Sequence, residues 1–168
     1  NPAPADGLDR SVISLADVLT PNRGELARLA ADDARRSGRP IPATDDPVGA
    51  ARSLFEPTDE GPGAGQAILV SLGASGAMLI RPTGAPKDIK APRVKAVDAT
   101  GAGDALNGAL AEALAMGLDL EQAARRAIVA ASLSVTRAGA REGMLTLDEL
   151  EAALGEPRRK AAEAAAAA

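Results

Sequence analysis

The chain has 168 residues, a net charge of −4 and an apolar fraction of 46%, with Phe55 as its single aromatic residue. This length allows one domain, with a core built from small and branched aliphatic side chains. An acidic balance without aromatic stacking platforms argues against nucleic-acid binding. Cys and His are both absent, which excludes thiol nucleophiles, disulfides, Ser-His-Asp triads and zinc sites that need those residues. Acid–base chemistry must therefore use Asp, Glu or Lys.

No apolar run approaches the length of a membrane-spanning helix, and the first residues lack the basic and apolar regions of a signal peptide. We therefore expect a soluble, cytoplasmic protein with no membrane partner. The chain begins without Met, which leaves open that it starts inside a longer sequence.

The first part of the chain alternates helical patterns with short apolar runs. We predict a helix over 8–15, a strand over 17–20, a helix over 22–34, a loop over 37–47, a helix over 48–56 and a loop over 57–65. Asn22 and Glu25 have the spacing of a capping box, in which each side chain satisfies an amide of the first turn. Residues 66–72 form a nearly continuous apolar run, typical of a strand buried on both faces of a parallel sheet. A turn over 73–76 then leads to its predicted hairpin partner over 77–80.

The second part of the chain begins with two short predicted strands, near 87–90 and 94–97. A glycine-rich turn follows, and then a helix that ends at Gly117, with apolar residues at helical spacing: Leu106, Ala109, Leu110, Ala113 and Leu114. Capping pairs predict two more helices, one from Asp119 to about 136 and one from Thr146 to about 154, separated by a turn over 138–140. The domain thus covers 1–155, and residues 156–168 form a low-complexity tail without an assigned role.

The turn over 98–104 is the strongest candidate for a site. Gly101, Ala102 and Gly103 carry little or no side chain, so an anion can approach their backbone closely. Amides at the start of a helix have no partner within the helix and lie at the positive end of its dipole. Asp104, which we place at the first helical position, supplies a carboxylate that could take a proton from an attacking hydroxyl. The structural alternative is a tight turn with an Asp cap.

Strands alternating with helices indicate an α/β fold with a mostly parallel sheet. In such sheets, ligands bind beyond the carboxyl ends of the strands. The loops at 21–22, 71–73 and 98–104 each follow a predicted strand. We therefore expect these three loops to converge on one edge of the sheet.

Five short motifs occur in order along the chain. They are Asn-Pro-Ala-Pro-Ala at 1–5, Asp-Val-Leu-Thr-Pro-Asn-Arg-Gly-Glu at 17–25, Val-Ser-Leu-Gly-Ala-Ser-Gly at 70–76, Asp-Ala-Thr-Gly-Ala-Gly-Asp at 98–104 with Asn-Gly-Ala at 107–109, and Ser-Val-Thr-Arg-Ala-Gly-Ala at 134–140. In this combination the chain resembles the carboxyl-terminal half of a ribokinase-like (PfkB family) sugar kinase, from residue 1 to about 154. The first and last motifs are most similar to those of ribokinases.

The resemblance implies the carboxyl-terminal part of a three-layer αβα, Rossmann-like fold with a mostly parallel sheet. It also implies transfer of the ATP γ-phosphoryl group to a sugar hydroxymethyl group, with D-ribose converted to D-ribose 5-phosphate as the leading assignment. Asp104 would be the base that accepts the proton of the sugar hydroxyl. The backbone amides of Gly101, Ala102, Gly103 and Asp104 would form an anion hole for the moving phosphoryl group. The full-length protein would be a homodimer.

The resemblance further implies nucleotide and metal sites. Asn22 would help to position magnesium and the phosphates, and Glu25 would hold Mg²⁺ through water. The nucleotide-binding residues would be Asn22, Ser71, Leu72, Gly73, Ala74, Ser75, Gly76, Gly103 and Ile128. A monovalent cation, K⁺, would be held by Asp98, Thr100, Ser134, Arg137, Gly139 and Gly143, several of them through backbone carbonyls.

The chain departs from the family pattern at several positions. Ala99 replaces a common Thr, Ile128 stands where a His or Asn often lies near adenine, Leu145 replaces a Pro, and residues 141–143 differ from the small polar residues expected beside the cation. The family's amino-terminal half, with most sugar-binding residues and the lid, has no counterpart in this sequence. We therefore expect the isolated chain to bind nucleotide weakly at best and not to phosphorylate sugar.

Three alternatives stay open at this point. The protein could be a fructokinase or another PfkB carbohydrate or nucleoside kinase, because substrate choice resides mostly in the missing half. It could be a non-catalytic nucleotide-binding or interaction module, although Asp104, Asn22 and Glu25 are all retained. It could also be a plain α/β domain whose turns are only turns.

Overall fold

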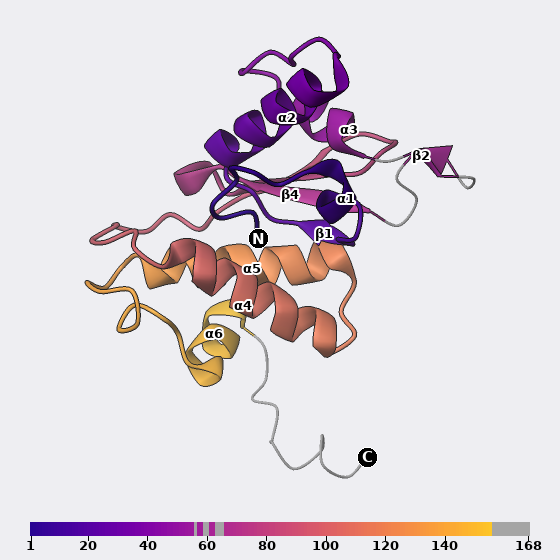
Figure 1. Ribbon diagram of the computed structural model, residues 1–168. Helices are drawn as coiled ribbons and strands as arrows, with labels where there is room; N and C mark the ends of the chain where they lie inside the picture. Colours follow the sequence, from indigo (N-terminus) through magenta and orange to yellow (C-terminus); the bar gives the residue numbers. More distant parts are fainter. Residues whose placement is uncertain (56, 59–60, 63–65, 156–168) are drawn as a thin grey trace. The chain divides into compact units, whose positions relative to one another are not determined.

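The computed structural model describes residues 1–55, 57–58, 61–62 and 66–155, and Figure 1 shows the order of its elements. The predicted tail over 156–168 and parts of the predicted helix end and loop, at 56, 59–60 and 63–65, lie outside the described residues. The chain divides into two compact units, Asn1–Ala91 and Pro92–Ala168, which are described separately below. Within the described part, no helix combines the length and hydropathy needed to cross a bilayer.

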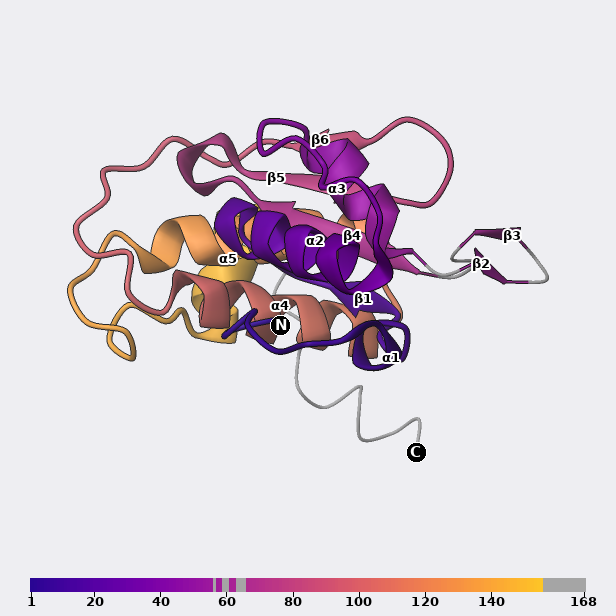
Figure 2. The ribbon, with the colours of Figure 1, turned by 45° about the horizontal axis from the view of Figure 1, so that its top comes forward.

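The first unit combines a small mixed sheet with three helices (Figure 2). Its helices are α1 (Arg10–Ile13), α2 (Arg23–Ser37) and α3 (Pro47–Leu54); its strands are β1 (Val18–Leu19), β2 (Pro57–Thr58), β3 (Gly61–Pro62), β4 (Ala67–Ser71), β5 (Ala77–Ile80) and β6 (Lys87–Ile89), and a 3₁₀ turn η1 (Gly73–Ser75) joins β4 to β5. The main sheet has the order β1-β4-β5-β6.

The pairing within this sheet corrects one expectation. Strand β1 runs parallel to β4, with Val18 opposite Ala67, whereas β4–β5 and β5–β6 are antiparallel. The sheet in the described residues is therefore mixed and not mostly parallel. The cause is local, because the short turn around η1 can join only antiparallel neighbours, and a parallel pair needs a crossover of a dozen residues or more.

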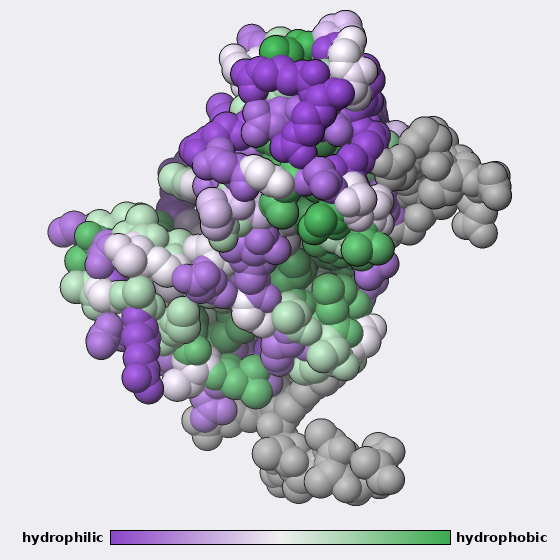
Figure 3. Space-filling view, viewed as in Figure 1, coloured by the Kyte–Doolittle hydropathy of each residue, from purple (hydrophilic) through white to green (hydrophobic). Residues whose placement is uncertain are grey.

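The apolar core of the first unit forms where α2 and α3 pack on the sheet (Figure 2). Leu26 and Leu29 of α2 and Leu54 of α3 join Ile68 and Val70 of β4 in one buried cluster. Residues at alternate positions of β4 are buried as well, so the prediction of a strand buried on both faces is confirmed. The outer face of α2 is hydrophilic (Figure 3).

Up to residue 155, the second unit is built from the helices α4 (Ala102–Ala115), α5 (Leu120–Ser134) and α6 (Leu147–Leu154). Helices α4 and α5 lie side by side in both ribbon views (Figures 1 and 2). Gly117, at φ 81°, allows the chain to turn between them, as predicted from the glycine. The buried side chains of these two helices include small and branched residues: Leu106, Leu110, Ala113, Ala123, Ala124 and Ala127.

Capping boxes at the starts of α2, α5 and α6 are confirmed in the structure, each with both reciprocal hydrogen bonds. Other local predictions were wrong. Residues 94–97 form no strand: the amide of Val97 donates to the carbonyl of Val135, and its side chain is 62% exposed. The predicted loop over 57–65 contains the two short strands β2 and β3. Leu114, predicted on the buried face of its helix, is 38% exposed.

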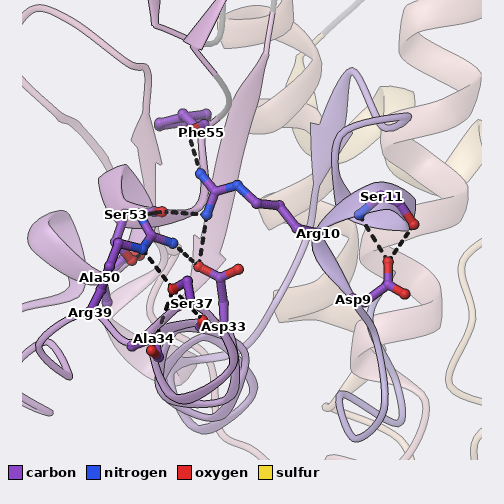
Figure 4. Close-up of polar contacts among 10 residues, drawn as sticks. All are labelled: Asp9, Arg10, Ser11, Asp33, Ala34, Ser37, Arg39, Ala50, Ser53 and Phe55. Atoms are coloured by element: carbon purple, nitrogen blue, oxygen red, sulfur yellow. Dashed lines mark hydrogen bonds and ion pairs between the residues drawn. The ribbon is translucent and has the colours of Figure 1, made fainter.

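An ion-pair cluster around Asp33 ties α1, α2 and the end of α3 together (Figure 4). The Asp33 side chain is 8% exposed, and its Oδ2 accepts from Arg10 Nη1 at 2.7 Å and from Arg39 Nη2. Arg10 also donates to the carbonyls of Ser53 and Phe55. The carboxylate is thus a shared acceptor for two arginines that reach it from different segments.

Replacing Asp33 with Ala should lower the free energy of unfolding by about 2–3 kcal/mol, because two partly buried guanidinium groups lose their common carboxylate. The measurement is urea unfolding followed by circular dichroism. Asp32→Asn is the matched control: Asp32 pairs with exposed Arg35 one turn along the same helix, so about 0.5 kcal/mol or less is expected. Equal effects of the two substitutions would refute the shared-acceptor role.

Candidate active site

The start of α4 lies at the centre of the candidate site. Gly101 is the N-cap, with φ 80° and ψ 0°, and no side chain caps the helix. The first intrahelical bond runs from the Ala105 amide to the Gly101 carbonyl at 2.9 Å. Asp104 is therefore the third residue of the helix, which corrects the prediction that it is the first. The correction places its carboxylate on the first turn, beside the free amides.

The backbone amides of this turn are mostly without acceptors. The amide of Ala102 donates to the Ala99 carbonyl at 3.2 Å. Within the described residues, the amides of Gly101, Gly103 and Asp104 have no recorded acceptor. Three of the four amides assigned to the anion hole are thus available to a ligand, and they lie at the positive end of a 14-residue helix.

Gly101 and Gly103 differ in whether the fold itself requires glycine at that position. At Gly101, φ is positive, and an added Cβ would lie 3.1 Å from Ala140 Cβ and 3.2 Å from the Ala140 carbonyl oxygen. The protein itself therefore requires glycine there. At Gly103, φ is ordinary and an added Cβ would meet nothing within 4 Å. Glycine at this helical position costs about 1 kcal/mol relative to Ala, and no contact within the described residues accounts for it.

The Asp104 side chain is exposed and has no recorded partner among the described residues. It lines a pocket of about 230 Å³ between α4, α5 and the segment that leads into α6. Gly108 and Glu112, one and two turns along α4, continue the same wall, and Leu145 and Leu147 form part of the opposite side. The carboxylate is therefore free to contact a molecule that approaches the helix start.

Asp98 organises the turn before α4. Its Oδ1 accepts from the Thr100 hydroxyl at 2.7 Å and from the Thr100 amide at 2.9 Å, and its Oδ2 accepts from the Gly139 amide at 2.9 Å. These bonds, with that from the Thr100 hydroxyl the strongest, lower the pKa of Asp98 to about 2. A permanent carboxylate thus joins the turn to the segment that follows α5.

Several of the residues assigned to the monovalent cation lie near this carboxylate or near one another. An added Cβ at Gly143 would lie 2.5 Å from the Ser134 carbonyl oxygen and 2.9 Å from that of Gly139, so these oxygens are close together. Arg137 can contribute only its carbonyl oxygen, because its guanidinium is itself a cation without an acceptor atom. The guanidinium pairs with Glu149. An oxygen-only donor set of this kind fits a hard cation. Within the described residues, no three Asp or Glu side chains form a metal cluster.

The nucleotide residues of the first unit also lie together. Asn22 forms a parallel bridge to Ser71, and the Ser71 amide donates to the Pro21 carbonyl at 2.9 Å, so the loops after β1 and β4 are adjacent as expected. The loop over 73–75 is exposed. Gly76 is required by the fold, because an added Cβ would lie 2.0 Å from the Ile89 carbonyl oxygen.

The capping box at α2 occupies part of the predicted magnesium site. The Asn22 amide donates to Glu25 Oε2 at 2.7 Å, and Asn22 Oδ1 accepts from the Glu25 amide at 2.9 Å. One Glu25 oxygen remains for a metal-bound water, which is the contact the resemblance implies. Ile128, predicted to lie against the base, is only 3% exposed, so its side chain presents little surface to a ligand.

The predicted site residues thus form two groups. Asn22, Glu25 and residues 71–76 belong to the first unit, and the turn at 98–104 with the cation residues belongs to the second. Convergence of the three loops on one sheet edge stays a prediction. Two contributors were missed by the sequence analysis: Ala140, which packs on Gly101, and Glu149, which was assigned only as a helix cap. Neither contact has a local sequence signal.

The pKa of Asp98 predicts an acid-sensitive second unit. Because its pKa in the folded state is below the unfolded value of 3.8, the stabilisation is complete above about pH 4 and is lost as the pH falls toward 2. Asp98→Asn should therefore reduce the fall in Tm between pH 5 and pH ~2.5, measured by circular dichroism. Asp45→Asn, at an exposed carboxylate with no recorded partner in the described chain, should leave the profile unchanged. An Asp98→Asn profile that matches the unsubstituted protein would contradict the assignment.

Known proteins resemble the chain over most of its length. Ribokinase from Haemophilus influenzae is 34% identical over 149 residues, which cover 89% of this chain and 44% of the relative. The crystal structure of ribokinase from Thermotoga maritima matches with a TM-score of 0.77 and 34% identity, over 92% of this chain and 48% of that one. Arabidopsis thaliana ribokinase, solved with ribose and ATP, matches with a TM-score of 0.69 and 27% identity, over 89% and 45%.

These likenesses show that the mixed sheet and its helices are part of a three-layer, ribokinase-like α/β fold, which confirms the expected fold class. The chain spans a little under half the length of the relatives it matches. The family model described as "pfkB family carbohydrate kinase" matches residues 1–148. The chain therefore belongs to the pfkB family of carbohydrate kinases.

Proposed function

We propose that this chain is the carboxyl-terminal part of an ATP-dependent sugar kinase that phosphorylates a hydroxymethyl group, with D-ribose as the leading acceptor. The observation that carries the proposal is the start of α4, where an exposed carboxylate stands beside amides without acceptors. Family membership supports phosphoryl transfer, and ribokinases among the relatives support ribose.

The proposed chemistry needs only positioning, one base and electrostatic stabilisation. The sugar hydroxyl oxygen bonds to the γ-phosphorus while the bond from that phosphorus to the β–γ bridging oxygen breaks, which leaves ADP. Asp104 takes the hydroxyl proton as the new bond forms. The amides of Gly101, Gly103 and Asp104 donate hydrogen bonds to the phosphoryl oxygens, where negative charge accumulates.

Nucleotide and metal assignments extend the proposal to the first unit. Ser71 and the exposed loop after it would hold the nucleotide, and Asn22 with Glu25 would orient magnesium-bound water and phosphate. A putative ribokinase II from E. coli, solved with ATP and Mg²⁺, supports both ligands. Mg²⁺ would neutralise phosphate charge when bound. The monovalent cation at Asp98 stays a prediction, as do a homodimer and a cytoplasmic location.

The acceptor sugar is the least constrained part of the proposal. Deoxyribokinases at 34% identity and a fructokinase structure at 26% identity are also among the similar proteins. Because the chain spans under half the length of its relatives, we propose that it does not phosphorylate sugar alone. A form extended to kinase length should be assayed with ribose, deoxyribose, fructose and adenosine. Turnover by the isolated chain that depends on ATP and Asp104 would contradict this point.

In the extended kinase, Asp104→Asn should lower kcat by about 10²–10⁴-fold, because the amide cannot accept the hydroxyl proton. The nucleotide KM should change little, since Asp104 faces the acceptor. A coupled assay for ADP release measures both constants. Asp45→Asn is the control for a neutral substitution of an exposed carboxylate. Unchanged turnover in Asp104→Asn would remove Asp104 as the base.

Gly103→Ala separates the demands of the ligand from those of the fold. Since an added methyl group meets no protein atom within 4 Å, Tm should stay the same or rise. Phosphoryl transfer should nevertheless fall by about 10²-fold, because the methyl group displaces the phosphoryl by about 1 Å from the amides. Ala111→Ser, at an exposed position of α4, is the control. Full activity in Gly103→Ala would show that no ligand approaches this backbone.

A further inference from the structure

The segment that follows α5 acts as a support for the turn before α4. The carbonyl of Val135 accepts from the amides of Val97 at 2.7 Å and Asp98 at 3.1 Å, and the Gly139 amide donates to Asp98. Ala140 lies beside Gly101, so close that a Cβ added at Gly101 would come within 3.1 Å of the Ala140 Cβ. The position of the first anion-hole amide is therefore set by residues 135–140, which lie about 35 positions further along the chain.

The same segment is also bound to α6. Arg137 Nη2 pairs with Glu149 Oε1 at 2.6 Å. The second oxygen of this carboxylate, Oε2, accepts from the Thr146 amide at 2.8 Å and closes the capping box of α6. Glu149 thus uses one oxygen for its own helix and the other for a residue 12 positions away. The hydrogen bond from Arg137 and those from Thr146 lower the pKa of Glu149 to about 2.

We propose that Glu149 is a positioning residue for the anion hole: through Arg137 it fixes residues 137–140, and through Ala140 it fixes the Gly101 amide. The proposal rests on the proposed phosphoryl transfer at α4 and adds a residue that does not touch substrate. A simple helix cap would explain only half of the geometry, because a capping box needs one oxygen at this position and Gln serves as well as Glu.

Because the Arg137–Glu149 pair is exposed, a positioning role can be distinguished experimentally from a contribution to stability. The side chains of Arg137 and Glu149 are 50% and 39% exposed, and ion pairs at such sites contribute little to stability. Loss of the pair should therefore leave Tm almost unchanged. Its effect should appear in the geometry of the amides, and hence in anion binding, because those donors act only when they are correctly placed.

The test uses the ¹⁵N-labelled chain and its amide signals during titration with inorganic phosphate. Glu149→Gln keeps an oxygen for the Thr146 cap but loses the ion pair with Arg137. We expect shifted signals for Gly139, Gly101 and Gly103, phosphate binding weakened by about threefold or more, and a Tm change below about 3 °C. Arg137→Met should have the same effect, the double variant should add little, and Arg137→Lys should restore part of the affinity.

Glu121→Gln is the matched control, because Glu121 pairs with Arg125 within α5 and this pair has similar exposure. It should change neither the glycine signals nor phosphate binding. If Glu149→Gln shifts only signals of residues 146–150, the positioning role is overturned. If the unsubstituted chain shows no phosphate response at Gly101 and Gly103, the anion-hole assignment fails instead. In that case, a shift of the Gly101 and Gly139 amide signals in Glu149→Gln would still show that Glu149 fixes the conformation of the turn, and unchanged signals would show that it does not.

Discussion

Unsatisfied backbone amides at the start of α4 are the feature on which the functional account depends. A helix that begins at a glycine with no capping side chain leaves donors exposed at the positive end of its dipole. Other helices of the chain satisfy this end, since α2, α5 and α6 each have a complete capping box. At α4, Asp104 does not cap the helix and its carboxylate stays exposed. The start of α4 thus differs from the capped starts of α2, α5 and α6, and local departures of this kind are typical of functional sites.

The turn before α4 is held in place by long-range contacts. Asp98 binds both Thr100 and the Gly139 amide, while Ala140 fills the space beside Gly101. An uncapped turn would otherwise have many conformations, and a donor that moves gives little stabilisation to a phosphoryl group. Hydrogen bonds and packing outside the site offset the conformational entropy that is lost when this turn is ordered. Within the described residues, the amides of Gly101, Gly103 and Asp104 therefore keep no protein acceptor and stay available to a ligand.

Much of the local structure could be predicted from the sequence, because its causes are local. The three capping boxes, the buried run of β4 and the glycine at the end of α4 each depend on residues within a few positions. The prediction of a strand over 94–97 was wrong because such a short segment does not specify a partner strand. The amide of Val97 donates instead to the carbonyl of Val135. The start of α4 was predicted at Asp104 but lies two residues earlier, at Ala102. The N-cap, Gly101, has no capping side chain that the sequence could reveal. The support of the turn by Arg137, Ala140 and Glu149 involves distant residues and had no pattern to detect.

The most direct test of the central claim is a crystal structure of the extended kinase with sugar, ADP, Mg²⁺ and aluminium fluoride, which mimics the phosphoryl group in transfer. The account predicts fluoride atoms within hydrogen-bond distance of the amides of Gly101, Gly103 and Asp104, with the sugar hydroxymethyl oxygen on the Asp104 carboxylate. A complex in which those amides contact only water, or in which another carboxylate holds the hydroxymethyl group, would contradict it.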